Sequence, residues 1–215
     1  MIIVRNAKLQ RKYILAAGAG LVAIGVFTGG YWSLGQGDRD RFAACRTSSV
    51  AGGLSVIGGP FTLVSETGET VSEQQVITKP TLLYFGYTFC PDVCPTDTAR
   101  NADAVDILAT LGHDVQSAMI SIDPARDTPA VMAEFTDYMH PDMIGLTGSI
   151  DQVKAASQAY RTYFRAQDAE DEYYLVDHST YTYLVAPKIG TMEYFDHNVA
   201  AEDLVQRSAC FLDKL

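Results

Sequence analysis

A buried strand that runs directly into a pair of cysteines is the feature that most limits how this chain can fold. Residues 81–87 (TLLYFGY) are almost all apolar or aromatic, which is typical of a strand covered on both faces of a sheet. Cys90 and Cys94 follow, and a helix is predicted over residues 94–111, with Gly112 as its stop. This order predicts an α/β domain that carries both cysteines at a helix N-terminus.

The rest of the chain from residue 59 alternates between strand and helix patterns. A short hairpin with a glycine turn is expected at residues 60–73. Further strands are predicted at 115–122, 144–146, 172–176, 180–186 and 192–195, and helices at 128–138, 149–163 and 201–215. Alternating strands and helices imply parallel pairing, whereas the last two strands form an antiparallel hairpin. The predicted fold class is therefore α/β, with a thioredoxin-like mixed sheet flanked by helices.

The N-terminal region has the pattern of a membrane anchor. Residues 13–34 carry no charge, and about 20 apolar residues in a helix span a bilayer. Four basic residues precede this run, so the positive-inside rule places residues 1–12 in the cytoplasm. A cleaved signal peptide is the alternative, although no clear cleavage site follows the run. Either interpretation exports the rest of the chain, with residues 35–58 as a tether and residues 59–215 as the domain.

We therefore expect a single-pass protein of an inner membrane. Its soluble domain would lie in the periplasm, or in the mitochondrial intermembrane space if the chain is eukaryotic. The exported part holds 12 basic residues against 26 acidic ones, which argues against nucleic acid as a partner. The acidity serves either solubility or docking to a basic partner. No oligomeric state is predicted.

The two cysteines of the loop are suited to redox chemistry or to metal binding. A helix N-terminus favours thiolate over thiol, and Cys94, in the first turn, should experience this most. The usual redox motif has two intervening residues, whereas three separate these cysteines, so both sulfurs can face one ion. Two thiolates and one imidazole suit Cu(I), and Cu(II) with an added ligand, whereas structural zinc favours four donors. A plain Cys90–Cys94 disulfide is the alternative.

Four histidines are candidates for the third ligand. Three of them, His113, His140 and His197, have neighbours typical of loops and turns. His178 lies between two β-rich segments in LVDHSTYTYLV, and we rank it first. A loop histidine with no metal role is the alternative.

Three separated motifs, YFGYTFCPDVCP, SIDPARDTP and YLVDHSTYTYLVAP, closely resemble those of the Sco/SenC family of copper chaperones. The resemblance covers residues 58–212 and implies a thioredoxin-like fold with copper, Cu(I) and Cu(II), bound by Cys90, Cys94 and His178. It also implies a role in cytochrome c oxidase assembly, by supplying copper to the dinuclear site of subunit II. The expected protein is then a metallochaperone rather than an enzyme. The alternative is a thiol–disulfide oxidoreductase that uses Cys90 and Cys94 to reduce the cysteines of that site.

Three further residues carry predictions. Asp92 is expected to orient a ligand or to offer an oxygen to Cu(II), and a solvated loop charge is the alternative. Cys45 lies in the tether, and Cys210 lies opposite the apolar face of the last helix. In an oxidising compartment, these two are expected to form a disulfide that pins the tether across that helix. Two free thiols or a covalent dimer are the alternatives.

Overall fold

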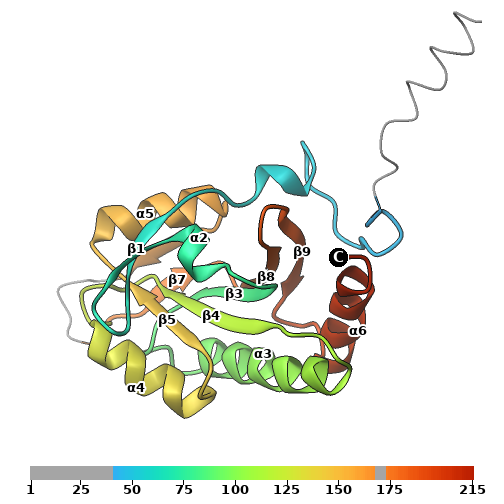
Figure 1. The fold of residues 1–215 in the computed structure, drawn as a ribbon. Coiled ribbons are helices and arrows are strands. Elements are labelled where there is room, and N and C mark those ends of the chain that lie inside the picture. Colours follow the sequence, from blue (N-terminus) through green and yellow to red (C-terminus); the bar gives the residue numbers. More distant parts are fainter. Residues whose placement is uncertain (1–40, 168–172) are drawn as a thin grey trace, which may run out of the picture. The chain divides into compact units, whose positions relative to one another are not determined.

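A seven-stranded mixed sheet, ordered β2-β1-β5-β4-β3-β8-β9, forms the centre of the computed structural model (Figure 1). Its parallel core consists of β3 (Thr81–Gly86), β4 (Gln116–Ser121) and β5 (Ile144–Thr147). The outer strands pair antiparallel: β1 (Thr62–Ser65), β2 (Thr70–Ser72), β8 (Tyr181–Ala186) and β9 (Gly190–Asp196). A separate two-stranded sheet joins β6 (Phe164–Ala166) to β7 (Val176–His178). The predicted mixture of parallel and antiparallel pairing is confirmed.

The structure describes residues 41–167 and 173–215, of which Ala44–Leu215 form one compact unit. The predicted membrane span, residues 13–34, lies outside these residues, as do the basic residues 1–12 and the first part of the tether. Within the described residues, no helix is both long and apolar enough to span a bilayer.

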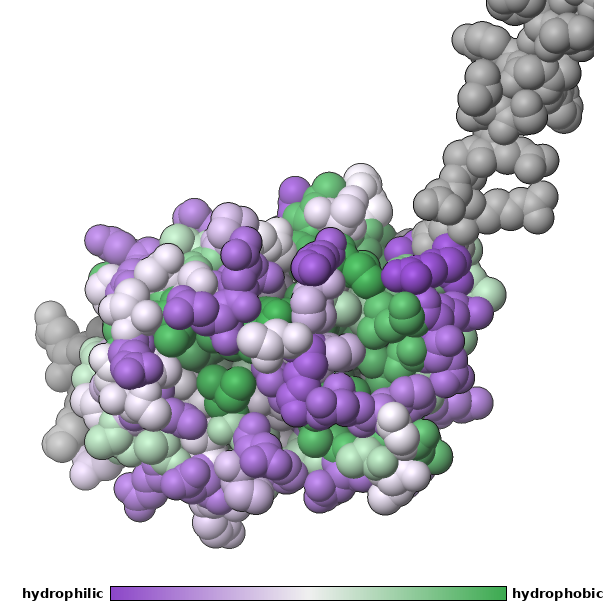
Figure 2. Space-filling view, viewed as in Figure 1, coloured by the Kyte–Doolittle hydropathy of each residue, from purple (hydrophilic) through white to green (hydrophobic). Residues whose placement is uncertain are grey.

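Helices cover both faces of the sheet. α3 (Val93–Thr110) and α4 (Pro129–Met139) lie along one side, with α6 (Ala201–Leu212) beside α3, and α5 (Ile150–Ala159) lies on the opposite side (Figure 1). The starts of two helices follow from local hydrogen bonds. Thr128 Oγ1 accepts from the amide of Val131 at 3.4 Å, and Ser149 and Gln152 form a capping box. On the face shown in Figure 2, hydrophilic residues predominate and hydrophobic ones form small separate areas.

Several predicted boundaries were wrong. The helix predicted to reach residue 163 ends at Ala159, because the backbone turns left-handed at Arg161, with a φ of 53°, and the Thr162 amide bonds back to the Ser157 carbonyl at 3.0 Å. The strand predicted at 172–176 begins only at Val176, and β6 and the four-residue helix α2 (Glu73–Val76) were not predicted at all. Elements of three or four residues are too short to show a period in the sequence.

The inner face of α3 is only partly apolar. Ala104 and Leu108 are buried, but Ile107 is 41% and Leu111 57% exposed. The buried face also includes the polar residues Asp97, Thr98 and Asn101. A period based on apolar residues cannot detect a buried face that is polar.

The folded unit begins inside the segment that the sequence suggested was a tether. Leu54 and Ile57 are buried in the core, in and beside the short 3₁₀ helix η1 (Leu54–Val56). The buried carboxylate of Glu193 accepts from the backbone amides of Thr47, at 2.9 Å, and Ser48, at 3.3 Å. Although burial alone would raise it, these hydrogen bonds lower the pKa of Glu193. The segment from residue 44 onward is therefore part of the domain.

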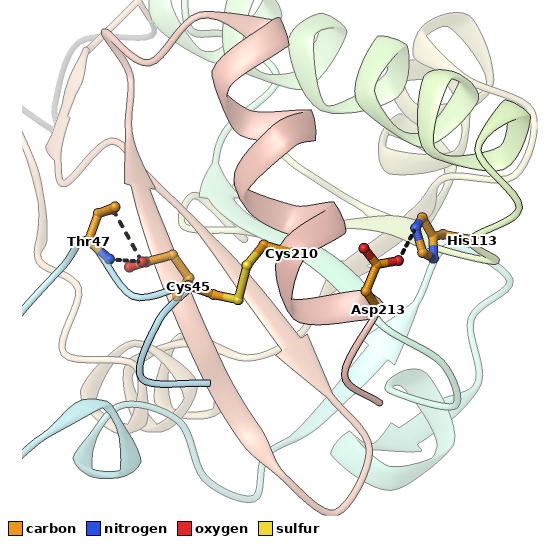
Figure 3. Close-up of a disulfide and its surroundings, with 6 residues drawn as sticks. Cys45, Thr47, His113, Cys210 and Asp213 are labelled. Atoms are coloured by element: carbon orange, nitrogen blue, oxygen red, sulfur yellow. Dashed lines mark hydrogen bonds and ion pairs between the residues drawn. A yellow bond between two sulfur atoms is a disulfide. The ribbon is translucent and has the colours of Figure 1, made fainter. Parts of the chain in front are cut away.

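A disulfide joins this segment to the last helix (Figure 3). The sulfurs of Cys45 and Cys210 are bonded, and their Cα atoms are 5.7 Å apart. Cys210 is partly exposed on α6, as expected, but Cys45 is only 5% exposed, which the sequence did not indicate. The bond closes a loop of 165 residues, so it restricts the unfolded chain strongly.

We predict that replacing Cys45 and Cys210 together with alanine lowers the free energy of unfolding by about 2–4 kcal/mol, because the unfolded chain gains freedom. Denaturant titration under non-reducing conditions measures this loss as unfolding at a lower midpoint concentration of denaturant. With reductant present, the wild type and the variant should converge. An unchanged non-reducing midpoint would contradict the prediction.

Candidate metal centre

Cys90 and Cys94 lie where β3 passes into α3. Cys94 is in the first turn of α3 and fully buried, whereas Cys90 precedes the helix and is 8% exposed. In the described part of the chain, both are free thiols. The strand–loop–helix arrangement predicted from the sequence is therefore present, and its two sulfurs are available for chemistry.

His178, the last residue of β7, meets these cysteines from a distant part of the chain. Its Nε2 lies 3.4 Å from the sulfur of Cys94. Its Nδ1 lies 2.9 Å from the carbonyl oxygen of Ser179. A hydrogen bond from Nδ1 to that oxygen orients the ring so that Nε2 faces the cysteines. One donor atom from each of Cys90, Cys94 and His178 lies within 4.8 Å of the others.

The two thiols share a proton unequally. A hydrogen bond from the Cys94 thiol lowers the pKa of Cys90, with further contributions from His178 and from the backbone amides of Asp92 and Cys94. The Cys94 amide lies 3.3 Å from the Cys90 sulfur. The same thiol–thiol hydrogen bond, together with burial, raises the pKa of Cys94. The pair therefore carries its thiolate on Cys90 and its proton on Cys94.

The expectation that Cys94 benefits most from the helix N-terminus was wrong. The free N–H groups at the start of α3 point out of the helix toward the loop before it, where the Cys94 amide faces the Cys90 sulfur. Cys94 itself lies within the first turn, where burial disfavours its charge. Distance along the helix alone did not reveal which sulfur the amides face.

Gly86, at the end of β3, leaves the space that the Cys94 sulfur occupies. A Cβ atom at this position would lie 2.6 Å from a ring carbon of Tyr84 and 3.1 Å from the Cys94 sulfur. Any side chain there must displace one of them. Gly86 was not among the predicted site residues, although a lone glycine within an aromatic strand indicates close approach of another group.

Asp127 holds the loop that leads to Cys90 and was also missed. Its fully buried carboxylate accepts from the Thr88 amide at 3.1 Å, from the Thr88 hydroxyl at 2.5 Å and from the Ser121 hydroxyl at 2.5 Å. Burial raises the pKa of Asp127, and these hydrogen bonds oppose that shift. Asp127 belongs to the SIDPARDTP motif, but the sequence does not show that this motif faces the cysteine loop.

The other predicted candidates lie outside the three-atom group. Asp92 is exposed, and its carboxylate is not part of the donor group. Its backbone amide, however, helps to lower the pKa of Cys90. Two of the remaining histidines pair with acids: His113 with Asp213, at 3.4 Å (Figure 3), and His140 with Asp106, at 3.2 Å. The backbone of His197 accepts from Arg100.

The donor set fits a soft metal ion. Hard cations such as magnesium and calcium need several oxygen ligands, and this group offers two sulfurs and one imidazole nitrogen. Ligand bonds of about 2.0–2.3 Å allow donor atoms to be up to about 4.6 Å apart, so at most a small movement is required. The rings of Tyr84 and Tyr87 stand edge-on to His178, at 6.4 and 5.8 Å, and limit water around it.

Comparisons with known proteins agree on one family. The SCO1/SenC family model matches residues 50–213. Protein SenC of Rhodobacter capsulatus is 49% identical over 210 residues, which cover 98% of this chain and 94% of that protein. The mitochondrial SCO1 homolog 1 of Arabidopsis thaliana is 40% identical over 153 residues, or 71% of this chain and 46% of that longer protein.

A solved structure supports the same relationship. The crystal structure of Arabidopsis thaliana ScoI with copper bound matches with a TM-score of 0.69 and 38% sequence identity. The match covers 74% of this chain and 98% of that one. The predicted thioredoxin-type α/β fold, with a mixed sheet and flanking helices, is thereby confirmed.

We predict that iodoacetamide modifies Cys90 well before Cys94, even below the ordinary thiol pKa of about 8.5, because Cys90 carries the thiolate. Mass spectrometry after timed labelling between pH 5 and 8 measures both rates, with the bonded Cys45 and Cys210 as unlabelled controls. Initial labelling at Cys94 would contradict the assignment, as would a Cys90 rate that rises with pH like that of a free thiol.

Proposed function

The chain belongs to the SCO1/SenC family, and on this premise we propose that it binds copper and serves in the assembly of cytochrome c oxidase. The observation that carries the proposal is the convergence of the donor atoms of Cys90, Cys94 and His178. Two soft sulfurs and one neutral imidazole nitrogen are the donors that copper prefers over harder ions. The copper in the matched Arabidopsis structure supports the same choice of metal.

Each of the three residues has a distinct role in holding copper. Cys90 provides a thiolate that already exists in the metal-free protein. It is 8% exposed whereas Cys94 is fully buried, so an incoming ion reaches the Cys90 sulfur first. Cys94 gives up its proton on binding, so copper affinity rises with pH. His178 supplies Nε2 as the nitrogen ligand, and the Ser179 carbonyl, 2.9 Å from Nδ1, orients the ring.

We further propose that the acceptor is the dinuclear copper site of subunit II of the oxidase. Copper then moves by ligand exchange, with each acceptor donor forming its bond as one of the three chaperone bonds breaks. The membrane anchor proposed at residues 13–34 would hold the domain on the outer side of the membrane, beside the oxidase. The acidic exported part favours an acceptor that is basic where the two proteins meet, so docking would weaken with salt.

A second function, thiol–disulfide exchange, is favoured by the unequal sharing of the proton. The Cys90 thiolate attacks one sulfur of a partner disulfide, which forms a mixed disulfide and releases the partner's other sulfur as a thiolate. Cys94, after losing its proton to that thiolate, attacks the Cys90 sulfur. The second partner thiol leaves, and a Cys90–Cys94 disulfide remains, so two electrons have passed to the partner. His178 is not needed as a ligand in this reaction.

We predict that His178→Ala weakens copper binding on the order of 100-fold or more while Cys90 and Cys94 still cycle between dithiol and disulfide. The test uses the full-length chain in mild detergent, with Cu(I) affinity measured against a chromophoric chelator. The Cu(II)–thiolate absorption band should also be lost. His197→Ala is the matched control, because that histidine lies outside the donor group.

The outcomes separate the two functions. Full copper affinity in His178→Ala would disprove the three-ligand site. Loss of copper from the wild type itself, with rapid cycling of the cysteine pair, would favour the oxidoreductase.

A further inference from the structure

Among the described residues, the strand that ends with His178 has no backbone pairing to the central sheet. Within the same residues β7 pairs with β6 alone, as a separate two-stranded sheet, whereas Cys90 and Cys94 extend from β3 of the seven-stranded sheet. The sequence separation between Cys94 and His178 is 84 residues. β8 begins three residues after His178 and pairs with β3, so the backbone brings His178 near the end of the cysteine strand. Side-chain contacts then hold β7 itself against the cysteine loop.

The first of these contacts is made by Tyr87, which is 2% exposed. Its hydroxyl accepts from the backbone amide of Val176 at 3.2 Å, at the start of β7. The same ring stands edge-on to His178. Tyr87 thus joins the end of the cysteine strand to the strand of the histidine.

The second contact uses three residues, Asp123, Arg126 and Tyr174, which we call the latch. The Tyr174 hydroxyl donates to Oδ1 of Asp123 at 2.5 Å. Arg126 Nε donates to the other carboxylate oxygen, also at 2.5 Å. The Arg126 guanidinium lies 3.7 Å from the centre of the Tyr174 ring and 4.7 Å from that of Phe89. Arg126 therefore contacts both the residue before Cys90 and the segment before β7.

The latch is an ordered arrangement and not an incidental surface contact. Asp123 is only 4% exposed, and a buried carboxylate is costly unless it is paired and hydrogen-bonded. Arginine stacked on two aromatic rings adds an attraction that a lysine would not reproduce. The latch and Asp127 together explain the charged residues of the SIDPARDTP motif. Asp123 and Arg126 hold Tyr174, while Asp127, outside the latch, holds Thr88.

We propose that Asp123, Arg126 and Tyr174 are positioning residues that hold His178 against Cys90 and Cys94 and thereby set how slowly copper is released. This inference rests on the proposed copper-binding function. A ligand held in place before binding avoids part of the ordering cost, so affinity is higher and dissociation is slower. The latch touches none of the three donor atoms. Tyr174 acts on copper through the strand of His178, whereas Arg126 also contacts Phe89, beside Cys90.

Tyr174→Phe tests the proposal by removing one hydroxyl and leaving the ring on Arg126. Cu(I) affinity should fall about 10-fold, the scale of losses when a group that orients a metal ligand is removed. The rate of copper release to a chelator should rise by a similar factor. Tyr138→Phe on α4 is the matched control, since Tyr138 is 84% exposed and lies outside the latch, and it should change neither quantity. Arg126→Lys, which keeps the charge but loses the stacking, should act in the same direction as Tyr174→Phe.

A double-variant comparison separates positioning from a general structural effect. In the His178→Ala background, Tyr174→Phe should cause no further loss of copper affinity, because Tyr174 acts through the strand of His178. In the metal-free chain, hydrogen exchange at the Val176 amide should become faster in Tyr174→Phe and stay unchanged in Tyr138→Phe. Equal losses in both backgrounds, or unchanged Val176 exchange, would overturn the latch.

The same set of variants distinguishes failure of the latch from failure of the proposed function. If His178→Ala weakens copper binding but Tyr174→Phe does not, the site stands and the latch is wrong. If His178→Ala retains copper, the three-ligand site is wrong, and Val176 exchange still decides whether the latch holds its strand.

Discussion

The thiolate of Cys90 at the N-terminus of α3 is the interaction on which the rest of the site depends. Its charge is stabilised by the Cys94 thiol and by backbone amides that α3 leaves free, including that of Cys94 at 3.3 Å. This arrangement requires the loop before α3 to hold one conformation, and Asp127 fixes that loop through Thr88. It also requires Cys94 to lie deep beneath the loop, in space that exists because residue 86 is glycine. The strand β3, the Asp127 carboxylate and the space left by Gly86 thus together position the Cys90 thiolate.

The histidine is held in a different way from the cysteines. The cysteines extend from the central sheet and its neighbouring helix, whereas His178 extends from a two-stranded sheet that side chains fasten to the cysteine loop. The cysteines are therefore held by the central sheet and α3, whereas His178 is placed by the start of β8 and by a few polar and aromatic contacts. Under the proposed function, the ligands must release the metal as well as bind it, and a histidine held differently from the cysteines serves both needs.

The sequence revealed the residue types of the site better than their geometry. The run TLLYFGY and the cysteines after it predicted strand, loop and helix, since burial and turn signals are local properties of the chain. His178 could be ranked only by its neighbours and by a family resemblance, because no local pattern reports a contact across 84 residues. The buried polar face of α3, with Asp97 and Asn101, was not predicted, because the apolar period misses it. The roles of Gly86 and Asp127 depend on what faces them, and only the folded chain shows that.

X-ray absorption spectroscopy of the full-length chain loaded with one equivalent of Cu(I) tests the central claim most directly. If Cys90, Cys94 and His178 hold the ion, the spectrum shows two sulfur ligands and one imidazole nitrogen, and the nitrogen contribution disappears in His178→Ala. A wild-type spectrum that contains sulfur ligands only, or one that His178→Ala leaves unchanged, would contradict the three-ligand site.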